Sequence, residues 1–107
     1  MFNGDLDITK KIKIIERLKS QLLSNISMLY SNMVEANTSD SNENIDILAD
    51  IIILSYLLSD KLGVSNEALD IKLINKLRLA GLQNDQNDEW AKEIIKLSKH
   101  LNKSRHI

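Results

Sequence analysis

The stretch that decides the fold reads Asn44-Ile45-Asp46-Ile47-Leu48-Ala49-Asp50-Ile51-Ile52-Ile53-Leu54-Ser55-Tyr56-Leu57-Leu58. On a helix, its apolar side chains would lie on every side instead of forming one stripe. A helix that is apolar all round has to be buried all round. A chain of 107 residues buries a smaller share of its surface than a larger protein does. The rest of the chain has room for only about three more helices, which cannot cover this one on every side within a single copy. We therefore expect a homodimer, or a dimer of dimers, with Ile52 and Tyr56 near the interface.

The sequence on both sides of this stretch also predicts helices. Apolar residues recur at steps of three and four from Ile8 to Met33, and polar turn formers fill residues 36–42. Asp7 and Ser65 are suitable N-caps, Gly63 and Gly81 are expected to end helices, and Trp90 is expected to anchor the last one. The prediction is an all-α bundle completed by dimerisation, with two long helices followed by two shorter ones. It forms one domain over residues 1–107, with helices at 7–35, 43–62, 66–80 and 89–102.

Composition excludes several classes of function. The chain has no cysteine, so it offers neither disulfides nor thiolate ligands, and it suits a reducing compartment. Its formal net charge is −1 and it has no basic recognition helix, so nucleic acid is not an expected partner. The first residues lack the features of a signal peptide, and the apolar stretch is too short to span a bilayer. We expect a cytoplasmic protein without a membrane segment.

Few residues of the chain are candidates for chemistry. Asp46 and Asp50 lie four residues apart and therefore on one face of the second helix. They could hold Mg²⁺, or they could be a helix-dipole contact and a polar contact to another helix. A basic set on the third helix could bind phosphates or could be a solvated face, and it comprises Lys72, Lys76 and Arg78. The only histidines, His100 and His106, lie near the C-terminus, where we expect them to be solvated.

Four segments of the chain resemble the MazG-like family of all-α nucleotide pyrophosphatases. The segments are Asn44–Leu54, Leu57–Ser65, Ile8–Lys19 and Leu69–Leu79. Active members of that family hold magnesium with a Glu-Glu-x-x-Glu motif on one helix and a Glu-x-x-Asp motif on the next. They hydrolyse nucleoside triphosphates to monophosphate and pyrophosphate. The resemblance thus implies a helical dimer and a metal site between two helices.

The acidic motifs of the family are depleted in this sequence. The first falls within residues 24–28, where Ser24, Asn25 and Met28 are neutral, and the second falls on residues 47–50, where Asp50 remains and Ile47 replaces a glutamate. The resemblance therefore implies the fold with a degenerate active site. Our leading hypothesis is a non-catalytic binding or regulatory homodimer without a cofactor, whose partner is a protein or a nucleotide. The alternative is a Mg-dependent nucleoside triphosphate pyrophosphohydrolase in which Asp46 replaces a lost ligand.

Overall fold

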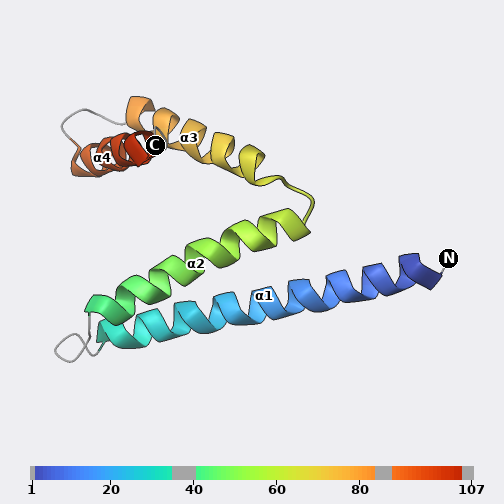
Figure 1. The fold of residues 1–107 in the computed structure, drawn as a ribbon. Coiled ribbons are helices and arrows are strands. Elements are labelled where there is room, and N and C mark those ends of the chain that lie inside the picture. Colours follow the sequence, from blue (N-terminus) through green and yellow to red (C-terminus); the bar gives the residue numbers. More distant parts are fainter. Residues whose placement is uncertain (1, 35–40, 84–87, 105–107) are drawn as a thin grey trace. The chain divides into compact units, whose positions relative to one another are not determined.

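A computed structural model describes residues 2–34, 41–83 and 88–104 of the chain (Figure 1). Within these ranges the secondary structure is helical. The helices are α1 (Phe2–Val34), α2 (Ser41–Lys61), α3 (Asn66–Gln83) and α4 (Glu89–Ser104). The all-α class and the order of two longer helices before two shorter ones are confirmed. No helix among the described residues is long and apolar enough to cross a membrane.

The chain divides into two compact units, Met1–Asn66 and Glu67–Ile107. The first unit contains α1 and α2, and the second contains α3 and α4. The proposal of one domain over residues 1–107 therefore stays a prediction. Each unit is described separately below.

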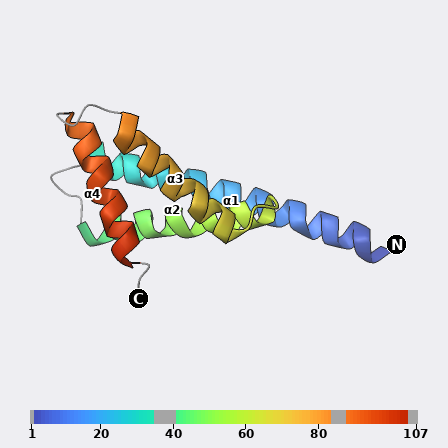
Figure 2. The same ribbon diagram turned by 90° about the horizontal axis from the view of Figure 1, so that it is seen from above.

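In the first unit, α1 and α2 run antiparallel and pack against each other along α2 (Figures 1 and 2). The line of contact buries Leu18 of α1 together with Ile47 and Leu54 of α2. Ile47 and Leu54 are seven residues apart, so they lie on one side of α2. Near the loop end of the pair, the Asn32 side chain donates a hydrogen bond to Oδ1 of Asn44 at 3.2 Å. This partly buried amide pair helps to fix the register of the two helices, since a shift along the axis would leave both amides unpaired.

A glycine ends α2 as the sequence predicts. Gly63 has a φ of +90°, in the left-handed region that L side chains rarely adopt. The amide of Val64 donates to the carbonyl of Ser59 at 3.0 Å, and the amide of Gly63 donates to that of Asp60 at 3.1 Å. These two bonds form a Schellman motif, which satisfies carbonyls that the end of a helix leaves unpaired. Helix α3 begins at Asn66, directly after the predicted cap Ser65.

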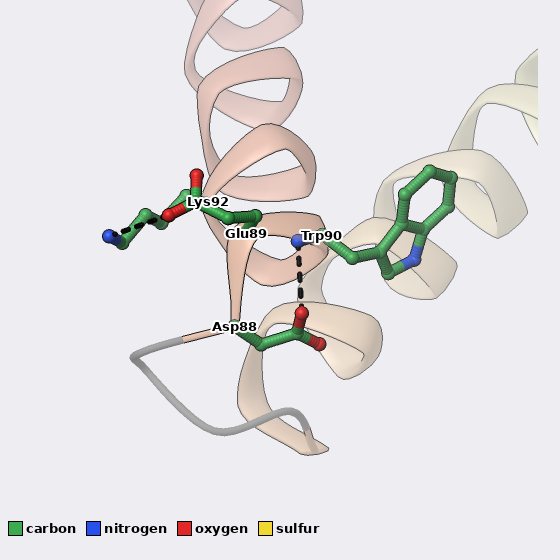
Figure 3. A network of polar contacts seen from close by, with 4 residues as sticks. All are labelled: Asp88, Glu89, Trp90 and Lys92. Atoms are coloured by element: carbon green, nitrogen blue, oxygen red, sulfur yellow. Dashed lines mark hydrogen bonds and ion pairs between the residues drawn. The ribbon is translucent and has the colours of Figure 1, made fainter.

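In the second unit, Asp88 caps the start of α4. Its Oδ1 accepts a hydrogen bond from the amide of Trp90 at 3.1 Å (Figure 3). Its carbonyl accepts one from the amide of Lys92 at 3.2 Å. Lys92 also pairs with Glu89 at 3.3 Å on the surface of the first turn. The expectation that Trp90 anchors α4 is wrong, because its side chain is 65% exposed. The buried residue of this turn is its neighbour Ala91.

Several helix boundaries differ from the predicted ones, among them the end of α4, which extends to Ser104 instead of residue 102. Helix α1 begins at Phe2, so Asp7 lies inside it and is not its N-cap. Helix α2 begins at Ser41, two residues before the predicted start at residue 43. Helix α3 continues through Gly81 to Gln83, since glycine costs a helix only about 1 kcal/mol relative to alanine and does not have to end it. Residues 36–40 of the predicted loop lie outside the described residues, as do residues 84–87 between α3 and α4.

The two glycines should respond in opposite directions to the same substitution. Gly63→Ala should lower the free energy of unfolding by about 1–2 kcal/mol, because a side chain disfavours the left-handed backbone there. No atom lies within 4 Å of the added Cβ, so the cost comes from the backbone alone. Gly81→Ala should raise stability by up to about 1 kcal/mol through helix propensity, because its Cβ would meet Ile95 Cγ1 at an acceptable 3.4 Å. Thermal and urea unfolding of both variants would check this, and equal effects of one sign would contradict it.

Candidate functional site

A hollow of about 370 Å³ lies between α1 and α2 in the first unit. Helix α1 lines it with Gln21, Ser24 and Asn25, and α2 lines it with Asp50, Ile53 and Leu54. Each helix contributes positions spaced by three and four residues, so one face of each helix forms the wall. Leu54 is buried in the line of contact, and the polar residues stand beside it at the solvent side.

The polar atoms of this hollow come from two amides, one hydroxyl and one carboxylate. Nδ2 of Asn25 donates to the carbonyl of Gln21 at 3.0 Å, which holds the Asn25 side chain along α1. The Asp50 side chain is exposed, and its carboxylate forms no hydrogen bond or ion pair with another described residue. Such a set can accept and donate hydrogen bonds to a polar ligand. It is a weak set for Mg²⁺, which favours carboxylate oxygens and phosphates in octahedral geometry.

The structure separates the predicted acidic pair by environment. Asp50 lines the hollow, whereas Asp46 is exposed one turn earlier on α2 and does not line it. The described residues contain no group of three or more histidine, cysteine, aspartate or glutamate side chains placed to hold a metal ion. A metal role for Asp46 and Asp50 stays a prediction.

The positions that align with the family's acidic motifs have three different environments. Ser24 and Asn25 line the hollow beside Asp50, as the resemblance implies. Met28 is 46% exposed and is not part of the lining, and Ile47 is 4% exposed in the core. Sequence reasoning missed Gln21, whose only signal is its position three residues before Ser24 on the same helical face.

The basic residues predicted to bind phosphate all lie on α3, in the second unit. Lys72 and Lys76 are four residues apart and share a face, whereas Arg78 lies about 200° around the helix from Lys76. Arg78 instead lines a groove between α3 and α4 together with Lys99. All of these side chains are exposed, as is His100, while His106 lies outside the described residues. Phosphate binding by the three residues stays a prediction.

Exposure of Asp50 predicts a small effect of its substitution on stability. Asp50→Asn and Asp50→Leu should each change the free energy of unfolding by less than about 1 kcal/mol, because no described residue loses a partner. Urea unfolding at neutral pH would measure this, with Ser20→Ala on the exposed face of α1 as a reference. A loss of several kcal/mol in the leucine variant alone would reveal a polar partner for this carboxylate.

Comparison with known proteins gives one match. The model of the MazG-like family matches residues 8–94 of this chain, which includes both walls of the hollow and the groove residue Arg78. No curated protein matches the chain, and no solved structure does.

Proposed function

Because this chain belongs to the MazG-like family, we propose that it keeps the family's helical framework and acts by binding, without hydrolysing nucleotides. The observation that carries the proposal is the lining of the hollow between α1 and α2. Ser24 and Asn25 stand there where the resemblance implies glutamates, and Asp50 is the one carboxylate beside them. The ligand would be a protein or a nucleotide, and the expected compartment is the cytoplasm.

Charge is the physical reason for proposing binding without hydrolysis. Hydrolysis of a triphosphate in this family depends on metal ions that offset the phosphate charge and activate a water molecule. One carboxylate with two amides and a hydroxyl does not fit such a metal cluster. A glutamate at position 47 would restore an acid of the motif, but it would place a charge at a 4%-exposed core position. The neutral residues and the packing at Ile47 therefore support the same proposal.

The alternative function is a Mg-dependent nucleoside triphosphate pyrophosphohydrolase that releases pyrophosphate. It is favoured by Asp50, which remains at the hollow, and by Asp46 one turn away. A second copy of the chain could add carboxylates such as Glu43 or Asp60, which are exposed on α2. In this alternative, carboxylates from two copies of the chain would together hold the metal ion.

We propose further that the chain acts as a homodimer, through apolar side chains of α2 that are exposed within one copy. They are Ile45 (61% exposed), Leu48 (47%), Ile52 (59%), Ile53 (54%) and Leu57 (47%). Contiguous apolar surface on a small protein is typical of an interaction site. A second copy would cover this surface and bring a second pair of Asp46 and Asp50 to the assembly.

The purified protein should release no pyrophosphate from ribo- or deoxynucleoside triphosphates in the presence of Mg²⁺ or Mn²⁺. One carboxylate per hollow leaves the metal and the attacking water without the required ligands. The measurement is pyrophosphate release from a panel of nucleotides. The control is an Asp46→Ala, Asp50→Ala double variant, which reports contaminating activity. Release well above that control would establish the hydrolase alternative.

Substitution of Ile52 tests the dimer. Ile52→Asp should shift the mass in light scattering from dimer to monomer at micromolar concentration, because it places a charge in an apolar interface. The helical signal in circular dichroism should persist, since Ile52 is 59% exposed within one copy. Ser20→Asp, an acidic substitution on the exposed face of α1, should leave the dimer intact. A monomer mass for the unmodified chain would contradict the proposal.

A further inference from the structure

The second unit contains a groove that the proposed function does not use. It has a volume of about 380 Å³ and lies between α3 and α4. Helix α3 contributes Leu77, Arg78, Gly81 and Leu82 to it, and α4 contributes Ile95, Ser98 and Lys99. We propose that this groove binds an acidic amphipathic peptide segment of another protein, with an apolar side chain on its floor and carboxylates at its rim.

The floor of the groove is apolar and accessible. Leu77 is buried beneath it, whereas Leu82 is 75% exposed and Ile95 is 39% exposed. Gly81 keeps the floor open because it has no Cβ, and a Cβ there would already contact Ile95 Cγ1 at 3.4 Å. A leucine-sized side chain of a partner would cover Leu82 and Ile95, and removal of apolar surface from water would favour this contact.

The rim of the groove carries positive charge from both helices. Arg78 and Lys99 form no ion pair with another described residue, whereas Lys19, Lys61 and Lys92 each pair with a neighbouring acid. Together α3 and α4 contain seven basic and four acidic side chains. Arginine and lysine beside an apolar surface are suited to a partner that presents carboxylates next to an apolar anchor.

A peptide segment fits this groove better than a lipid surface does. The floor lies in a concavity between two helices, which a protruding side chain reaches and a flat bilayer does not. Helix-in-groove recognition uses apolar anchors spaced by three or four residues, and the acidic residues of the partner would flank them.

Fluorescence anisotropy of the full chain would test this site. The probe is a fluorescein-labelled, alanine-rich helical peptide with two leucines four residues apart and glutamates next to each leucine. The unmodified chain should bind it, and Lys99→Glu or Arg78→Glu should weaken binding about tenfold, because each replaces attraction by repulsion. Lys103→Glu makes the same charge change one turn further along α4, outside the groove, and should change affinity less than about twofold. Circular dichroism would verify that every variant is folded.

Two further probes make the test specific. A peptide with serine in place of both leucines should not bind. The Leu82→Ser variant of the protein should also lose binding, and it should still fold because Leu82 is 75% exposed. Equal losses in Lys103→Glu and Lys99→Glu, or undiminished binding of the serine peptide, would overturn the proposal in favour of diffuse charge attraction. Binding to anionic phospholipid vesicles that depends on Lys99, without binding to the peptide, would overturn it in favour of a lipid surface. The groove shares no lining residue with the hollow between α1 and α2, so these results are independent of the pyrophosphate assay.

Discussion

The packing of α2 against α1 is the constraint on which the rest of the first unit depends. One neighbouring helix can cover only one side of α2, and it buries Ile47 and Leu54. The other apolar side chains of α2, such as Ile52 and Ile53, are not covered by α1. Burial of apolar surface is the main favourable term in folding, so a helix covered on one side retains a large driving force for association.

The same line of contact determines what each position of α2 can do. Ile47 lies in the contact, where a carboxylate would be stranded, whereas Asp50 lies at its edge beside Ser24 of α1. Asp50 follows Ile47 by only three residues, yet Ile47 lies in the core and Asp50 lines the hollow. The chain therefore has apolar packing at one position of the family's second acidic motif and a charge at the other.

Periodicity and resemblance predicted much of this molecule. Steps of three and four residues predicted the helices, and Gly63 predicted the end of α2. The resemblance implied a site between two helices, and the hollow lined by Ser24 and Asp50 lies between α1 and α2. Local signals did not predict that Gly81 lies within α3, because helix hydrogen bonding outweighs the modest cost of a glycine. The sequence also could not predict the exposure of Trp90, since exposure depends on which elements pack nearby and not on the residue itself.

The neutral residues beside Asp50 also affect the electrostatics of the helix pair. Carboxylates gathered in a small space repel one another unless a cation neutralises them, so a helix pair with a full acidic cluster is most stable with its metal bound. Here Gln21, Ser24 and Asn25 are neutral, and Asp50 is a single exposed charge. Packing of α1 on α2 therefore needs no cation to offset repulsion across the hollow. Under the proposed function, the helix pair of the family is thus kept by apolar packing at Leu18, Ile47 and Leu54.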